Sequence, residues 1–226
     1  MIVKSRQELL IVNPNTSVQV TGWVAQEARR VIDGNWEIVA INAESGLEAI
    51  ETPADLRLAS ASVASAVLAR PRASGAVIAA FGDPGLEAAR AQSSMAIVGL
   101  GESGIHAASK RGRRFSIVTI GEAMKAPIAE RVAQLGFADQ LASVRILPFG
   151  IAEFVASREA GLPLVEAQAR VCFEIDKADV VLLGGAPFAG VAHTLGFEAG
   201  LPLLDGVEAS IVRLTGRSLA SGKGAA

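Results

Sequence analysis

The sequence predicts an α/β fold with parallel sheets, built as two similar Rossmann-like lobes. Short apolar runs rich in Val, Ile and Leu end in Gly, Asn, Asp or Pro, and alanine-rich stretches with apolar residues at three- and four-residue steps follow them. Buried parallel strands alternating with amphipathic helices produce this pattern. Of the 226 residues, 50% are hydrophobic and 19% charged, so the chain can bury a substantial core without disulfides or metal ions.

The order of the elements follows from these runs. Strands are expected at residues 9–12, 36–41, 75–80 and 96–98, then at 115–119, 144–147, 180–183 and 202–204. Helices are expected at residues 18–32, 54–69, 122–134 and 164–175, where apolar side chains share one face. The uncharged stretch 180–197 contains several glycines and a proline, which predicts a strand, a glycine loop and a helix start instead of a membrane span.

The two sets of strands keep the same spacing, which indicates an internal repeat. Ile11 falls on Ile117 and Ile97 on Leu203, each at a shift of 106 residues. Any two α/β segments of similar length align to some degree, and this alternative stays open. A repeat predicts two lobes related by a pseudo-twofold axis, residues 1–96 with 208–226 and residues 97–207. Ligands of parallel sheets bind beyond the carboxyl ends of the strands, so we expect the active-site cleft between the lobes.

Composition excludes several classes of function. The net charge is −2 and aromatic residues make up 4% of the chain, with no Tyr, so we expect no nucleic-acid partner. One cysteine, Cys172, and two histidines are too few for an internal disulfide or a zinc cluster. The charged N-terminus is unlike a signal peptide. We therefore expect a cytoplasmic protein with no membrane partner and no bound metal.

The first candidate ligand-binding loop follows the first expected strand. Asn13-Pro14-Asn15-Thr16-Ser17 precedes a helix, and its side chains and exposed amides can cap that helix or bind a carboxylate or a polarised carbonyl. A helix cap without a ligand is the alternative. We expect Asn13 to orient a small-molecule substrate.

Two further loops follow the third and seventh expected strands. In the first of them, Asp83 is the candidate catalytic acid or base, although an Asp before Pro also stabilises turns. In the second, Gly184-Gly185 lets a ligand approach the backbone closely, and a tight strand-to-helix turn is the alternative. We expect Ala80 and Phe81 from one loop, and Gly185 and Ala186 from the other, to contact the substrate.

A fourth motif matches the pattern of a dinucleotide-binding site. Gly99-Leu100-Gly101-Glu102-Ser103-Gly104 spells G-x-G-x-x-G directly after a strand. The helix expected next is short, and Thr119 stands at the end of the following strand, where the fingerprint requires an acidic residue. NAD(P) binding is kept as a weaker alternative.

Four motifs together resemble the aspartate/glutamate/hydantoin racemase superfamily, and within it most closely the hydantoin and allantoin racemase branch. They occur in the family's order over residues 9–214. The motifs are Asn13-Pro14-Asn15-Thr16-Ser17, Phe81-Gly82-Asp83-Pro84-Gly85-Leu86, Val98-Gly99-Leu100-Gly101-Glu102-Ser103 and Leu183-Gly184-Gly185.

The resemblance implies two α/β lobes, no cofactor, and a pair of cysteines facing opposite sides of the substrate carbon. One cysteine removes the acidic proton next to a carbonyl and the other returns a proton to the opposite face. This sequence departs from that pattern, because Ala80 and Gly185 stand at the two cysteine positions. Neither side chain can carry a proton.

We therefore expect a cofactor-independent isomerase of this family that abstracts a proton from a small carboxylate, hydantoin or ureide carbon acid without a cysteine. In this hypothesis Asp83 is the base, backbone amides at Ala80–Phe81 and Gly185–Ala186 hold the oxyanion, and Thr119 orients the substrate with Asn13. The alternative is a catalytically inactive small-molecule binding protein on the same fold. We further expect a homo-oligomer.

Overall fold

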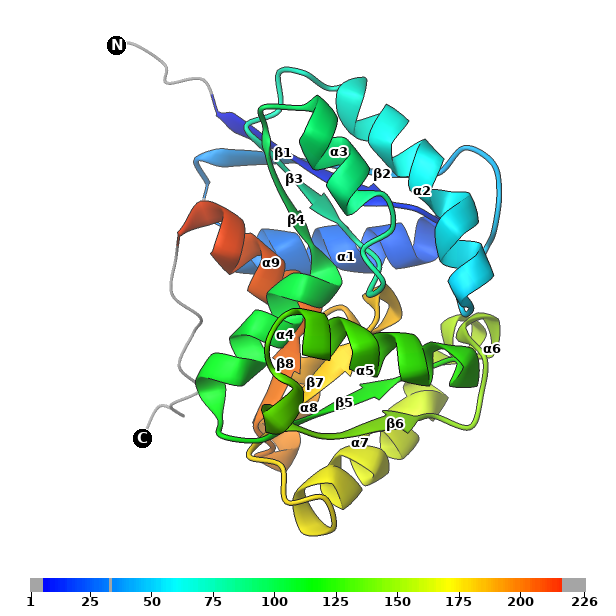
Figure 1. Ribbon diagram of the computed structural model, residues 1–226, viewed down its shortest axis with the longest axis vertical. Coiled ribbons are helices and arrows are strands. Elements are labelled where there is room, and N and C mark those ends of the chain that lie inside the picture. Colours follow the sequence, from blue (N-terminus) through cyan, green and yellow to red (C-terminus); the bar gives the residue numbers. More distant parts are fainter. Residues whose placement is uncertain (1–5, 33, 217–226) are drawn as a thin grey trace.

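The protein is described here by a computed structural model that covers residues 6–32 and 34–216 and contains two four-stranded sheets flanked by helices (Figure 1). The strand orders are β2-β1-β3-β4 and β6-β5-β7-β8, and every described strand pairing is parallel. The equivalent orders confirm the predicted α/β fold with two similar lobes.

The element bounds agree with the predicted order. The strands are β1 (Gln7–Asn13), β2 (Trp36–Asn42), β3 (Gly75–Ile78), β4 (Ala96–Gly99), β5 (Phe115–Thr119), β6 (Leu141–Ile146), β7 (Val180–Gly184) and β8 (Leu203–Asp205). The α-helices are α1 (Val18–Val31), α2 (Pro53–Leu68), α3 (Leu86–Gln92), α4 (Leu100–Arg111), α5 (Lys125–Gln134), α6 (Ile151–Ala156), α7 (Arg158–Glu174), α8 (Val191–Ala199) and α9 (Gly206–Thr215).

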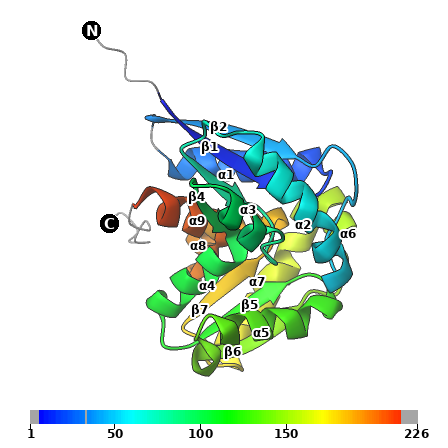
Figure 2. The same cartoon turned by 45° about the horizontal axis from the view of Figure 1, so that its top comes forward.

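Helices cover both faces of each sheet. In the first lobe, α2 and α3 pack on one face, against Leu10, Val12 and Ile78. In the second lobe, the corresponding outer face packs against α7 and α8, with Val181 and Leu183 in its core. Residues of the two remaining faces belong to one continuous hydrophobic core. Helices α4 and α9 lie between the two sheets (Figures 1 and 2).

Two helices of that shared core each follow a strand of one sheet and pack against the other sheet. Helix α4 begins directly after β4 of the first sheet and packs against β7 and β8 of the second. Helix α9 begins directly after β8 of the second sheet and packs against β3 and β4 of the first. Gly104 allows close packing in α4, because a Cβ there would lie 2.8 Å from Leu182 Cδ1 of β7. This exchange holds the strand ends of the two lobes together.

Most differences from the expected elements lie at their ends. Strand β3 ends at Ile78, two residues before the expected end, so Ala79 and Ala80 belong to the loop. The chain leaves the first sheet after Gly99, because β4 includes residues 96–99. The expected lobe boundary between residues 96 and 97 therefore falls inside β4, and the rest of the division into lobes stays a prediction.

No described helix combines the length and the apolar character needed to cross a membrane. Among residues 6–32 and 34–216, no group of three or more His, Cys, Asp or Glu side chains is placed to hold a metal ion.

Candidate active site

A small cavity of about 50 Å³ lies where the carboxyl-end loops of the two sheets meet. The register aligns Val12 of β1 with Ile78 of β3, and Thr119 of β5 with Gly184 of β7, so the loops that follow these strands come together. Residues of both lobes line the cavity: Asn15, Ile50, Leu56, Ala79, Ala80, Phe81 and Gly82 from the first, and Thr119, Ile120, Met124, Ile128, Ile151, Gly184, Gly185, Ala186, Pro187 and Phe188 from the second. Five of the expected substrate contacts are in this set.

Asn13 is the exception among the expected substrate contacts. Its side chain is fully buried and its Nδ2 donates to Asn15 Oδ1 at 2.8 Å and to Thr21 Oγ1 at 3.0 Å. The structure therefore corrects the expectation for Asn13: it supports the loop, and Asn15, two residues later in the same motif, lines the cavity. Because Asn15 Oδ1 also accepts from Ser17 N at 3.0 Å, its Nδ2 is the polar atom available to a bound molecule.

Asp83, the expected base, does not line the cavity among the described residues. It sits one residue beyond the lining residue Gly82, in the left-handed region with φ +49°, and its carboxylate turns toward α4. Oδ1 accepts from Gly101 N and Oδ2 from Glu102 N, both at 2.7 Å. Burial raises the pKa of Asp83 to about 7, against the lowering effect of these two N–H groups. The structure thus places Asp83 as the cap of α4, a role that the turn motif alone does not reveal.

The same contacts explain the G-x-G-x-x-G motif. A Cβ on Gly99 would collide with the Asp83 carboxyl group, and a Cβ on Gly101 would collide with the Phe81 carbonyl oxygen. These glycines therefore make room for the loop that carries Phe81 and Asp83. A pyrophosphate would need the N–H groups at the start of α4, and Asp83 already occupies those of Gly101 and Glu102. These contacts argue against the dinucleotide interpretation of the motif.

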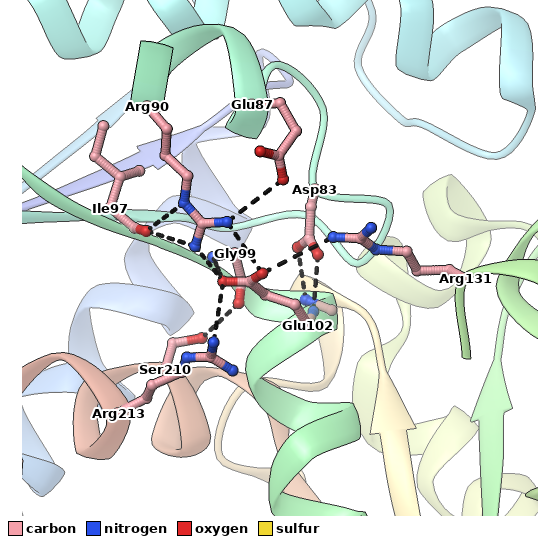
Figure 3. A network of polar contacts seen from close by, with 10 residues as sticks. Asp83, Glu87, Arg90, Ile97, Gly99, Glu102, Arg131, Ser210 and Arg213 are labelled. Atoms are coloured by element: carbon pink, nitrogen blue, oxygen red, sulfur yellow. Dashed lines mark hydrogen bonds and ion pairs between the residues drawn. The ribbon is translucent and has the colours of Figure 1, made fainter. Parts of the chain in front are cut away.

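Glu102 joins this cap to a cluster of arginines from three helices (Figure 3). Its side chain is 4% exposed and bonds Arg90 of α3 at 2.5 Å, while Arg131 of α5 and Arg213 of α9 lie within 3.9 Å. Burial opposes the ionised carboxylate, but Arg90, Arg213 and the Gly99 N–H together outweigh it and hold the pKa of Glu102 below its ordinary value. The sequence shows Glu102 only as part of the G-x-G-x-x-G motif and as a candidate for proton transfer, because its arginine partners come from other helices.

The second lobe presents an equivalent loop after β7. Thr119 Oγ1 donates to Gly184 O at 2.5 Å, which holds the end of β5 against the loop. Gly185 follows with φ 162°, an extended conformation open to any residue type. A Cβ there would lie 3.3 Å from Phe188 Cδ2 and 3.4 Å from Pro187 Cδ. A side chain at Gly185 therefore needs only a small movement of its neighbours.

The described residues that line the cavity include no Asp, Glu, His, Lys, Arg or Cys. The polar side chains among them are Asn15 and Thr119. Cys172 lies in the outer core of the second lobe with no exposed surface, and burial raises the pKa of its thiol. It packs as a small apolar residue, as its helical position predicts.

Comparison with known proteins assigns the chain to a family. The model of the family described as Asp/Glu/Hydantoin racemase matches residues 9–214. The chain belongs to this racemase family. It is 31% identical over 206 residues to the hydantoin racemase of Pseudomonas sp. (strain NS671), covering 90% of this chain and 83% of that protein. It is 34% identical over 205 residues to the hydantoin racemase of Paenarthrobacter aurescens, covering 89% and 87%.

The structural comparison agrees with this branch of the racemase family. The allantoin racemase from Klebsiella pneumoniae matches with a TM-score of 0.88 and 27% identity, covering 95% of this chain and 90% of that one. The resemblance to the hydantoin and allantoin branch is therefore confirmed, and racemases are isomerases. Within this scaffold, Ala80 and Gly185 line the cavity, at the two positions where the resemblance implies cysteines.

Proposed function

We propose that this racemase-family protein is an isomerase that binds a neutral five-membered ring ureide of the hydantoin type, with an apolar substituent on its acidic carbon. The composition of the cavity wall carries this proposal. Asn15 and Thr119 supply hydrogen-bonding groups, and the other lining side chains are apolar, among them Leu56, Met124 and Phe188. Burying an apolar substituent among them is favourable, by about 25 cal/mol per Å².

The lining residues also favour hydantoins over the other substrates of this family's name. Free aspartate or glutamate carries carboxylates, whose burial without a cationic partner is costly. No Arg or Lys is among the described residues of the cavity wall. A hydantoin ring is neutral and needs only hydrogen-bond donors and acceptors. The backbone of Ala80–Phe81 and Gly185–Ala186, with Asn15 and Thr119, is suited to provide them.

Racemisation requires a proton to leave and return to the acidic carbon. Since the described side chains of the cavity wall cannot carry it, the base in this proposal is a solvent species admitted to the space beside Ala80 and Gly185. The protein contributes by holding the ring and stabilising the enolate as its charge develops. Removal of a single donor from such an oxyanion site costs about 10²- to 10³-fold in other enzymes. No cofactor takes part, and the acting species is a cytoplasmic homo-oligomer.

A second candidate function is binding without turnover. The same absence of a titratable side chain from the described cavity wall favours it. In that case the protein retains the ring-binding pocket and has lost the chemistry.

Proton NMR in D₂O tests both. A panel of single enantiomers would include 5-benzylhydantoin, 5-isobutylhydantoin, allantoin and glutamate. We expect exchange of the acidic carbon-bound proton of the apolar hydantoins above the protein-free rate, rising with pH because the base comes from solvent. Saturable binding of hydantoins without faster exchange would support the binding function instead. Neither binding nor exchange of any hydantoin would contradict both candidates.

A further inference from the structure

Two of the loops that line the cavity, those after β3 and β7, are each tied by one buried aspartate to the N-terminus of a helix that crosses to the other lobe. In the first lobe, Asp83 stands on the loop and accepts from the backbone of α4. In the second lobe, Asp205 stands at the end of β8, just before α9, and Oδ1 accepts from Val207 N at 2.7 Å. Its Oδ2 accepts at 2.5 Å from the N–H of Gly190, on the loop after β7. Both carboxylates therefore bridge a cavity loop and a helix start.

The internal repeat shows that the two aspartates occupy exchanged positions. Gly99 ends β4 directly before α4, and Asp205 ends β8 directly before α9. The two loops also match, since Gly85 and Gly190 precede α3 and α8 with φ +71° and +81°. A Cβ at Gly99 would collide with the Asp83 carboxyl group. The space at this junction thus holds one carboxyl group, which comes from the loop in one lobe and from the strand end in the other.

The partners of these carboxylates indicate what they do. Among the described residues, neither aspartate forms an ion pair with a basic side chain. Both side chains are nearly inaccessible to solvent, at 8% and 3% exposure. Their hydrogen bonds go to backbone N–H groups, two for each carboxylate. Such bonds fix the path of the main chain without supplying a reactive group to the cavity.

We propose that Asp83 and Asp205 are a matched pair of positioning residues, each of which fixes one cavity loop on a crossing helix and so sets the spacing of the backbone groups that face the substrate. This inference rests on the proposed function for its substrate, and it concerns loop geometry in the free protein as well. It assigns no proton transfer to either aspartate.

The first test compares Asp83→Asn and Asp205→Asn with Asp176→Asn. The control residue accepts hydrogen bonds from Arg145 and Ser143, away from the cavity-lining residues. At pH 8, where both aspartates are ionised, an Asn amide places one N–H donor against a backbone donor, so one of the two bridging bonds is lost. Hydrogen–deuterium exchange by mass spectrometry on the ligand-free proteins should show about ten- to hundredfold faster exchange in residues 79–86 for Asp83→Asn. Asp205→Asn should have the same effect on residues 184–191, and the control should affect neither segment.

Affinity for 5-benzylhydantoin, measured by NMR titration, supplies the substrate readout. Both loop variants should bind about tenfold more weakly, while the control binds like the wild type. Lowered melting temperatures with unchanged loop exchange and unchanged affinity would overturn the positioning role. If the wild type binds no hydantoin, the proposed function fails, and the loop exchange in the free protein still decides the positioning role.

An exchange of positions provides the second test. Asp83→Ala/Gly99→Asp moves the carboxylate of the first lobe to the strand end, as in the second lobe, into space that Asp83 vacates. We expect Asp83→Ala to lose the exchange protection of residues 79–86 and the double variant to regain most of it. A double variant that folds, as judged by circular dichroism, but stays as unprotected as Asp83→Ala would contradict the equivalence of the two aspartates.

Discussion

Replacing Ala80 and Gly185 with cysteine is the perturbation that tests the site most directly. Both residues line the cavity, one from each lobe. Ala80 already has a Cβ, so cysteine adds one sulfur atom beside the cavity. At Gly185 the new Cβ would lie 3.3 Å from Phe188 Cδ2, and the extended backbone imposes no strain. We expect the double variant to fold, with about 1 kcal/mol lost to tighter packing.

The size of the effect follows from what a positioned acid or base contributes. One such group accelerates proton transfer by about 10²- to 10⁴-fold. The wild-type cavity wall has no such side chain among its described residues, so a thiol should raise the rate by about this factor. A single thiol can act on only one face of the substrate carbon. Ala80→Cys or Gly185→Cys alone should therefore exchange the proton without inverting the carbon.

The assay follows one enantiomer of 5-benzylhydantoin in D₂O by proton NMR and by chiral chromatography. Each enantiomer presents its acidic proton to only one of the two thiols. One single variant should therefore incorporate deuterium into this enantiomer with retention of configuration, and the other should do so only into the opposite enantiomer. The double variant should racemise the substrate as it exchanges. Cys172→Ala controls for the native thiol, which is fully buried. It should change neither the rate of deuterium exchange nor the rate of racemisation. A folded double variant that binds the hydantoin yet exchanges it no faster than wild type would show that these positions do not face the acidic carbon.

Three further predictions concern stability and closure of the cavity. Glu102→Gln should lower the free energy of unfolding by about 2 kcal/mol in urea denaturation, because a buried carboxylate that three partly exposed arginines surround loses its charge. The same change at Glu87, whose side chain is 75% exposed, should cost less than about 0.5 kcal/mol. Between pH 5 and 8, the free energy of unfolding should fall as the pH rises, because Asp83 and Asp205 both have folded pKa values raised to about 7 and keep protons that the unfolded chain releases. Urea denaturation at several pH values should show a flatter pH dependence when either aspartate is changed to Asn. An unchanged slope would contradict the raised pKa values. Beside the cavity, Glu51 of the first lobe accepts a hydrogen bond from the backbone N–H of Ile151 in the second lobe at 2.6 Å. Glu51→Ala should therefore weaken hydantoin binding severalfold in an NMR titration and lower the free energy of unfolding by about 1 kcal/mol. Unchanged affinity would show that this bond does not help to close the cavity.

The sequence predicts the strands, the helices α1, α2, α5 and α7, and the loops after β1, β3 and β7, since these depend on local periodicity and on glycine-rich turns. The helices α3, α6 and α9 are not among those it predicts. It does not predict the roles of Asn13 and Asp83. Both have polar side chains in loops after strands, and in sequence such residues look alike whether they face a ligand or the main chain. The contact of Asp83 with Glu102 spans 19 residues and depends on α4 crossing to the other lobe. Local patterns contain no information on that crossing.

The G-x-G-x-x-G motif also looks the same in sequence whether it binds a ligand or not. Its glycines allow close approach, but of another loop of the same chain. In a dinucleotide-binding fold the glycines admit a pyrophosphate to the helix start. Here Gly99 and Gly101 admit the carboxyl group of Asp83 and the carbonyl of Phe81. Buried oxygen acceptors therefore meet the helix N-terminus in both cases, and only the group that carries them differs. The motif identifies the physical requirement, and the neighbouring loop decides what meets it.

The cavity wall itself argues for a bound molecule, with or without thiols. Asn15 and Thr119 in this wall are buried polar residues at the edge of an apolar core, where apolar side chains would cost less. Asn15 accepts hydrogen bonds from Asn13 and from the Ser17 backbone, and Thr119 donates one to the Gly184 carbonyl. Both side chains are therefore held in place beside the cavity. The backbone at Gly185 accepts any residue, so the fold does not require a thiol to be absent there. The scaffold that positions the substrate is thus physically separate from the groups that would move its proton, and a protein can keep the first after losing the second. Deuterium exchange by the wild type, set beside that of the double cysteine variant, measures how far this separation has gone.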